Sequence, residues 1–337
     1  MTEREPTPDS AGSAPTYWRR ILLVATFAVI LAAVLLFPFP QTGRYSSQLF
    51  NLAHAPSFFA TFLLVAGLLD PSCIGFSDAW HRILPLGVVR LMILVSVLLV
   101  VGVACEVLQG FVGRSPSVSD VMANGCGLVA GLFWCFGRRQ TARLRRIGLS
   151  MIAGGLLLTA SLSSILELYD CWLQHRDFPL LASFERSREL HTWHAQNATI
   201  EPSAEWQTDG SASLEVRGLA GKNYSGANFL WPIADWRGFT ALELDVFNPG
   251  GNPLTLKITI SDNLHAATGY ESTDRFATSV ELPPQQDVHI RIELKDVENS
   301  PATRQMDLSQ INSLNLFIGR PKSDFVFMLD NVRLVKD

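Results

Sequence analysis

The sequence predicts a multi-domain protein: an N-terminal all-α transmembrane bundle of about five spans, followed by a C-terminal all-β jelly-roll sandwich. Long apolar runs fill the first half, whereas short alternating runs separated by turn residues fill the second. Residues 1–176 carry 13 arginines, no lysine and nine acidic residues, against 14 basic and 22 acidic residues in 177–337. The net charges of +4 and −8 indicate two domains in different surroundings. Neither half is basic enough to predict a nucleic-acid partner.

Five apolar runs approach the length of about 20 residues that crosses a bilayer. The first run ends in FPFPQ without a small-residue cleavage site, so it is expected to be a retained anchor. The second and fourth runs contain polar residues, and the count of five depends on them. The predicted segments are a cytoplasmic tail at 1–17, spans at 18–37, 52–69, 84–105, 118–136 and 147–168, a linker at 169–178 and a sandwich at 179–337.

Arginines predict the orientation of these spans. Arg19 and Arg20 precede the first span, and five arginines lie between residues 138 and 146, in the loop between the fourth and fifth spans. Because cytoplasmic loops are enriched in basic residues, the N-terminus and this loop are expected in the cytoplasm. Five crossings then place the second half outside. The expected location is the inner membrane of a bacterium, with the sandwich periplasmic or extracellular.

Polar residues flank the loop between the third and fourth spans, directly beside two of the most apolar runs in the chain. Two lie three residues apart at the end of the third span and two lie four apart at the start of the fourth, so each pair shares a helix face. A histidine begins the second span on the same side. The residues predicted to meet at the outer face are His54, Glu106, Gln109, Arg114, Asp120 and Asn124.

Two interpretations of this cluster stay open. Arg114 could pair with Glu106 or Asp120 and pin two helix ends, with Ser117 or Ser119 capping the fourth span. Alternatively, the cluster could form an outward-facing pocket for a lipid-linked or envelope-bound polar group, since ionisable groups at a membrane boundary are costly unless paired or functional.

The order of these residues resembles the VanZ-like membrane family over roughly residues 20–140. The resemblance rests on His54 in NLAHAPSFF, on EVLQGFVGR at 106–114 and on SVSDVMANGCG at 117–127. Members often have Asp-Lys just before the histidine, where this chain has Leu52-Ala53. The family is named for a teicoplanin-resistance protein, so the resemblance implies a role in the cell envelope, with glycopeptide resistance as the family's name-giving property.

Gly127 and Gly131 form a G-x-x-x-G in the fourth span. Small residues at this spacing allow two helices to approach closely. We expect them to pack against another helix of the same chain.

The second half predicts an antiparallel sandwich. Period-two runs bounded by Gly, Pro and Asn are typical of strands, and about 160 residues of them suit a jelly roll. A single helical turn is expected at 307–314. The predicted strands are 213–219, 241–248, 254–262, 289–294, 313–319 and 325–335.

This half resembles carbohydrate-binding modules of the galactose-binding-like type. The resemblance rests on SFE (183–185), TDGSASLEV (208–216), DWRGFTALELDVFNP (235–249), DRFATSVELPP (274–284), DLSQINSLNLFIG (307–319) and MLDNVRL (328–334). It implies glycan binding, and a structural Ca²⁺ held by Glu185 and Asp330 with Asp209 joining from the TDG turn. In the alternative interpretation, Asp330 and Asn331 are polar strand-edge residues.

Sugar binding usually needs an aromatic platform, although tryptophans in a sandwich are more often part of the core. Tyr224, in the polar loop KNYSGAN, and Trp231, before Pro232, are the candidates expected to be exposed. Trp206 and Trp236 are expected to pack, and Trp193 is a further candidate.

Three functions follow from these patterns. In the first, the sandwich binds a glycan and the bundle anchors it in envelope polysaccharide or peptidoglycan processes. In the second, the outer-face cluster acts as a membrane enzyme on a lipid-linked saccharide or peptidoglycan precursor. In the third, the cluster is structural and the sandwich contacts a protein. The expected partners are a glycan or lipid-linked saccharide and membrane lipid.

Overall fold

The computed structural model describes residues 44–69, 87–112, 116–230 and 232–337. Its chain divides into two compact units, residues 1–168 and 169–337. The first predicted span, residues 18–37, lies outside the described residues, and so do Arg19, Arg20, Arg114 and Trp231.

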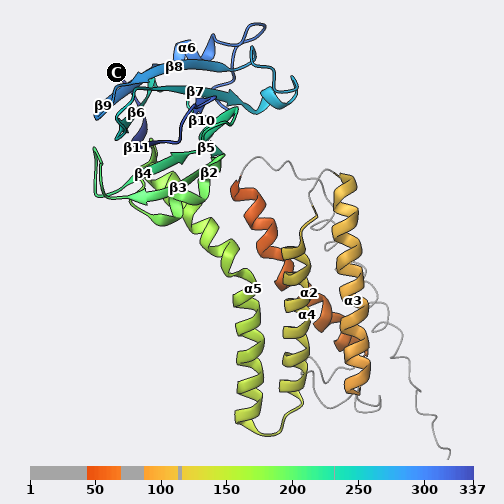
Figure 1. Cartoon of the computed structure of the whole chain (residues 1–337). Helices are drawn as coiled ribbons and strands as arrows, with labels where there is room; N and C mark the ends of the chain where they lie inside the picture. Colours follow the sequence, from red (N-terminus) through yellow and green to blue (C-terminus); the bar gives the residue numbers. More distant parts are fainter. Residues whose placement is uncertain (1–43, 70–86, 113–115, 231) are drawn as a thin grey trace, which may run out of the picture. The chain divides into compact units, whose positions relative to one another are not determined.

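Four helices match the second to fifth predicted spans in position. They are α2 (Arg44–Leu69), α3 (Val88–Gln109), α4 (Val118–Arg138) and α5 (Arg143–Asp177), with a short 3₁₀ helix, η2 (Gly110–Val112), after α3. Each of the four is long and apolar enough to cross a membrane. Figure 1 labels them along the chain.

The helices extend beyond the apolar runs that predicted them. Helix α2 begins at Arg44 instead of residue 52, so His54 lies ten residues into the helix and not at its start. Helix α5 continues to Asp177, through most of the segment expected to be a linker. Hydropathy locates only the apolar part of a helix, because backbone hydrogen bonding continues into polar residues at either end.

Helices α2 and α4 lie side by side (Figure 1) and touch through glycines. A Cβ added at Gly127 would lie 2.2 Å from the carbonyl oxygen of Ala55, and one at Gly131 would lie 2.5 Å from the Phe62 ring. Such a close approach requires a residue without a side chain. The expected G-x-x-x-G contact within one chain is therefore confirmed.

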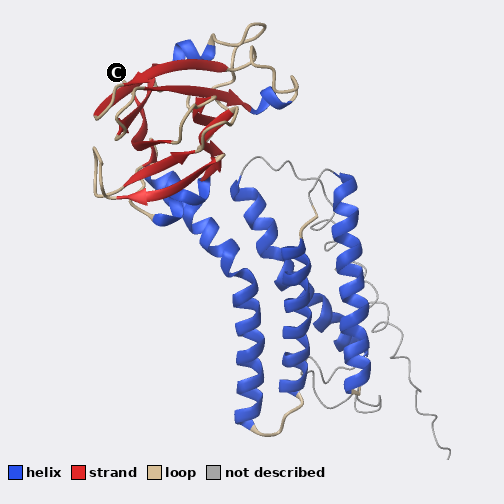
Figure 2. Ribbon diagram, in the orientation of Figure 1, coloured by secondary structure: helices blue, strands red, loops and turns tan. Residues whose placement is uncertain are grey.

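The second unit is an antiparallel β-sandwich with eleven described strands (Figure 2). One sheet has the order β3-β4-β11-β6-β9, with β1 pairing with β11, and the other has the order β2-β5-β10-β7-β8. The strands are β1 (Leu180–Ala182), β2 (Trp193–Gln196), β3 (Ala198–Ser203), β4 (Ser213–Gly218), β5 (Tyr224–Leu230), β6 (Ala241–Asn248), β7 (Leu254–Asp262), β8 (Phe276–Leu282), β9 (Gln286–Glu293), β10 (Ile311–Gly319) and β11 (Phe325–Val335).

The chain passes repeatedly from one sheet to the other, as in a jelly roll. It changes sheet at every connection from β4 to β7 and again at every connection from β8 to β11. Three short helices complete the unit, η3 (Ser187–Thr192), η4 (Asn263–Ala266) and α6 (Leu294–Glu298). All six predicted strands are present. The prediction of a helical turn at 307–314 is wrong, because residues 308–309 form a tight turn and β10 begins at Ile311.

The core lies between the two sheets. Alternate residues of each strand point inward, and Leu314, Leu316 and Ile318 of β10 are all buried. Trp236 is fully buried, and Trp193 stacks on Phe229 with 4.8 Å between ring centroids. Both tryptophans are therefore core residues, which leaves the opposite faces of the strands to carry polar side chains.

Candidate functional site

The outer face of the second sheet joins polar and aromatic side chains in adjacent rows. On β10, Asn315 pairs with Asn228 of β5 on one side and with Thr259 of β7 on the other. These residues alternate with buried apolar residues of the same strands, so their side chains stand on the outer face. Asn315 donates to the Thr259 hydroxyl at 3.0 Å. The row offers amide and hydroxyl groups in a fixed array.

An aromatic pair forms the next row, at one end of this face. Phe317 of β10 lies opposite Gly226 of β5, where a Cβ would come within 2.1 Å of the Leu316 carbonyl oxygen. Tyr224 is 48% exposed and meets Phe317 edge to face, with centroids 5.2 Å apart. The predicted contact residue Tyr224 therefore lies on an open face, beside a buried ring that fixes its position.

Two pockets follow this face. The first has a volume of 330 Å³ and is lined by Tyr224, Phe317, Lys257 and Arg275 among others. The second has a volume of 320 Å³ and is lined by Arg275, Asn315 and Tyr270 among others. Arg275 belongs to both, so the pockets adjoin. Tyr270 is 71% exposed, so each pocket has an exposed tyrosine at its wall.

Arg304 holds the segment between β7 and β8 that carries Tyr270 and leads to Arg275. Its guanidinium donates to both oxygens of Asp262 at 2.6 and 2.8 Å and to both oxygens of Asp274 at 2.7 and 2.8 Å. The Asp262 side chain is 0% exposed and that of Asp274 is 6% exposed. Hydrogen bonds from Arg304 lower the pKa of Asp274 to about 2. The loop is thus fixed by a bidentate ion pair at each end.

Sequence reasoning found Tyr224 but missed Arg275, Tyr270 and Asn315. A signal for Asn315 exists in SLNLFIG, where Asn and Phe alternate with apolar residues, because one face of a strand has period two. Arg275 and Tyr270 give no such signal, since their segment has no periodicity. Of the other aromatics, Trp206 stacks on Phe247 at 5.5 Å, on the first sheet, as expected for a packing role.

Two of the three carboxylates expected to hold calcium, those of Asp330 and Glu185, accept hydrogen bonds from residues 208–212. Asp330 is fully buried and accepts from the backbone N–H groups of Thr208, Asp209 and Asn331. Glu185 accepts from residues 211 and 212, and these bonds lower its pKa. The two oxygens of a carboxylate together have about four lone-pair sites, more than these backbone hydrogen bonds occupy. Calcium at Glu185, Asp209 and Asp330 therefore stays a prediction.

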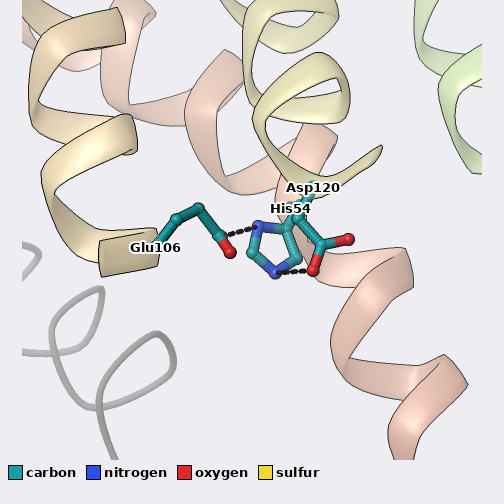
Figure 3. A group of neighbouring side chains, drawn as sticks. All are labelled: His54, Glu106 and Asp120. Atoms are coloured by element: carbon teal, nitrogen blue, oxygen red, sulfur yellow. Dashed lines mark ion pairs between the residues drawn. The ribbon is translucent and has the colours of Figure 1, made fainter. Parts of the chain in front are cut away.

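In the helical unit, the structure brings His54, Glu106, Asp120 and Asn124 together from three helices. His54 Nδ1 lies 3.0 Å from Asn124 Oδ1 and 3.7 Å from Glu106 Oε1, while Nε2 lies 3.8 Å from Asp120 Oδ2. Figure 3 shows the imidazole between the two carboxylates. All four residues are buried, as is Gln109. Each nitrogen of the ring thus faces an acidic group.

The start of α4 explains how two carboxylates come to face one histidine. Ser117 caps the helix by accepting from Ser119 N at 3.2 Å. In a capping box the acidic residue three positions later, here Asp120, would accept from the Ser117 N–H. That N–H instead donates to Glu106 of α3 at 3.3 Å. Glu106 takes the capping role, and Asp120 lies against His54.

This arrangement is compatible with both interpretations of the cluster. The Glu106–Ser117 bond ties α3 to α4, which is a structural function. The imidazole between two carboxylates is also a common acid–base arrangement. Arg114, the expected cation, lies outside the described residues.

Comparison with known proteins gives weak similarities to the sandwich. One solved structure is an exo-beta-agarase, with 17% identity and a TM-score of 0.38, covering 47% of this chain and 25% of that chain. Another is the family 11 carbohydrate-binding module from Clostridium thermocellum in complex with a beta-1,3-1,4-mixed-linked tetrasaccharide, with 16% identity and a TM-score of 0.37, covering 47% of this chain and 94% of that chain. A third is the CBM22-1 xylan-binding domain of Xyn10C from Paenibacillus barcinonensis, with 18% identity and a TM-score of 0.32, covering 47% of this chain and 96% of that chain. The matched region thus spans a quarter of the agarase.

The sequence comparisons find no match: no profile of a known protein family matches the chain, and no curated protein does. The expected VanZ-like membership, with its link to glycopeptide resistance, stays a resemblance in the residues named above. Similarities this low leave the function of the sandwich to be argued from its own geometry.

Proposed function

We propose that residues 179–337 bind a glycan on the outer face of the second sheet. The observation that carries this proposal is the pair of adjoining pockets that combines exposed tyrosines with an ordered row of amide and hydroxyl groups. A sugar ring presents a C–H face that packs on an aromatic ring and hydroxyl groups that exchange hydrogen bonds with amides. Sites of this kind join an apolar contact surface to a few fixed polar groups.

The helical unit serves as the membrane anchor in this proposal. Apolar residues of α3, among them Val89, Ile93 and Val100, are exposed in the described chain, as expected where lipid covers a helix. On α5, Tyr169 stacks on Trp172 with centroids 5.8 Å apart, directly after the apolar segment. Aromatic residues are enriched where helices leave the membrane. The arginine pattern then predicts that the sandwich lies in the periplasm or at the cell exterior of a bacterium.

Anchoring has a physical consequence for binding. A sandwich tethered to the membrane meets any surface glycan at high effective concentration, so a weak site suffices. This fits a function in envelope polysaccharide or peptidoglycan processes.

Tyr224→Ala tests the proposed site. Loss of the aromatic contact, worth about 0.5–1.5 kcal/mol beyond the buried area, is expected to weaken glycan binding by about tenfold. The measurement is binding of the full chain in detergent to an array of bacterial-surface and plant polysaccharides, followed by titration of each hit.

The matched control is Trp206→Ala, which removes a stacked aromatic from the other sheet. If Trp206→Ala weakened binding while Tyr224→Ala did not, the site would lie on the first sheet. A folded chain that bound no saccharide would overturn glycan binding and favour a protein partner.

A second candidate function rests on the His54 cluster. Flanked by two carboxylates, His54 could move a proton on a lipid-linked saccharide or peptidoglycan precursor at the outer face. The check is turnover of an undecaprenyl-pyrophosphate-linked sugar by the full chain in nanodiscs. Glu106→Gln should abolish turnover in a chain that still inserts, because a neutral amide cannot stabilise the imidazolium that forms when His54 takes up a proton.

A further inference from the structure

The pocket beside Tyr224 is basic. Its described lining includes Lys257 and Arg275, together with hydroxyl and aromatic side chains, but no carboxylate. In the part of the chain that the structure describes, no ion pair or side-chain hydrogen bond involves either residue. By contrast, Arg291, Arg304 and Arg333 each pair with an acidic residue of the same unit. The two cations of this pocket are therefore available to a ligand.

Arg275 also has a buried donor without a partner. Its Nε–H is shielded from solvent and has no acceptor among the described residues. An unsatisfied buried donor costs on folding, and the cost is recovered when an acceptor arrives. A carboxylate or sulfate can accept from Nε–H and a second guanidinium N–H together, in the bidentate geometry that arginine favours. The neighbouring Asp274–Arg304 pair fixes the backbone that carries Arg275.

The positive charge of this pocket contrasts with the acidic surface around it. Residues 177–337 carry a net charge of −8, and the outer face of the first sheet holds Glu243 and Asp245. In the adjoining pocket the carboxylate of Asp262 is already bound by Arg304. A basic pocket in an acidic domain indicates selection for an anionic ligand, because the domain as a whole repels one.

We infer that the glycan is an acidic saccharide, whose carboxylate or sulfate group binds between Arg275 and Lys257 while a sugar ring packs on Tyr224. This inference rests on the proposed glycan site and names its substrate class. The aromatic pair and the amide row flank the two cations, so the anion is expected to be attached to a sugar.

The test compares ligands that differ only in charge. Full chain in detergent is titrated with oligogalacturonate and with its methyl ester, and in a second arm with a sulfated galactan oligosaccharide and its desulfated form. The acidic member of at least one pair should bind roughly tenfold more tightly, and added salt should reduce that advantage. The arm that responds identifies carboxylate or sulfate.

Variants assign the effect to the pocket. Arg275→Gln and Lys257→Gln should each remove most of the preference for the acidic member. Lys222→Gln is the matched control, since it removes a positive charge from an exposed loop outside the pocket. It should change neither affinity.

The outcomes separate this inference from the proposal beneath it. If neutral and acidic members bind equally, and Tyr224→Ala weakens both, the glycan site stands and the inference is overturned. If the preference survives Arg275→Gln and Lys257→Gln, the anion binds elsewhere. If no saccharide of either charge binds the folded chain, both the proposed function and the inference fail.

Discussion

Arg304→Ala is expected to destabilise the β-sandwich by about 3–5 kcal/mol. The substitution leaves the carboxylate of Asp262, which is 0% exposed, and that of Asp274, which is 6% exposed, without the cation that neutralises them. Removing one partner of a buried ion pair costs more than the pair contributes, because the remaining charge stays desolvated. Thermal or urea unfolding of the full chain in detergent, with the Arg304→Ala variant compared with the parent by near-ultraviolet circular dichroism, measures the change.

Arg237→Ala is the matched control. Arg237 also makes a bidentate pair, with Asp235 at 2.7 and 2.9 Å, but its side chain is 67% exposed. An exposed pair contributes about 0–1 kcal/mol, so this variant should unfold almost as the parent does. Equal effects of the two substitutions would show that burial of the Arg304 cluster does not govern its contribution.

The same cluster should make the sandwich sensitive to acid. The pKa of Asp274 is about 2 in the folded chain against an ordinary 3.8, so its contribution is present above about pH 4 and is lost as pH falls towards 2. The amount is on the order of 2 kcal/mol. In the Arg304→Ala variant this part of the pH dependence should disappear.

A functional effect should accompany the loss of stability. The loop between β7 and β8 carries Tyr270 and ends at Arg275, and both line the candidate site. Without Arg304 the loop loses the ion pairs at both ends, so glycan affinity should fall even at temperatures where the sandwich remains folded.

The sequence allows the strands and the aromatic Tyr224 to be predicted because their signals are local. Strands 241–248, 254–262 and 325–335 match β6, β7 and β11, since apolar and polar residues alternate along most of LTLKITISD and along part of each of the other two runs. Strand β5 escapes prediction because YSGANFL contains Gly226 and Asn228, residues disfavoured in strands. The structure supplies the reason for the glycine, a backbone approach that leaves no space for a Cβ.

Contacts between distant residues could not be predicted. Arg304 is 42 residues from Asp262 and 30 from Asp274, and nothing in the local pattern pairs them. The His54 cluster can be predicted in part, because helical spacing places Glu106 with Gln109, and Asp120 with Asn124, on common helix faces. That Glu106 caps α4 in place of Asp120 depends on the packing of α3 against α4.

Gly127→Ala is expected to separate α2 from α4 and to destabilise the helical unit by about 1–3 kcal/mol, or more. The new methyl group would lie 2.2 Å from the carbonyl oxygen of Ala55 and 3.0 Å from Phe59 N, and both are backbone atoms that cannot move aside by changing a rotamer. Loss of helix packing should appear as a lower unfolding temperature in detergent. Cys135, fully buried in α4, should react faster with a membrane-permeant thiol reagent.

Gly125→Ala, on the same helix α4, controls for helix propensity, because the added methyl would meet only the Leu99 side chain of α3 at an ordinary 3.8 Å. Alanine favours a helix more than glycine does, so this variant should be neutral or slightly more stable. If Gly127→Ala behaved the same way, the close approach of α2 and α4 would be refuted. Because Ala55 follows His54 directly, helix separation should also break the 3.0 Å contact between His54 and Asn124.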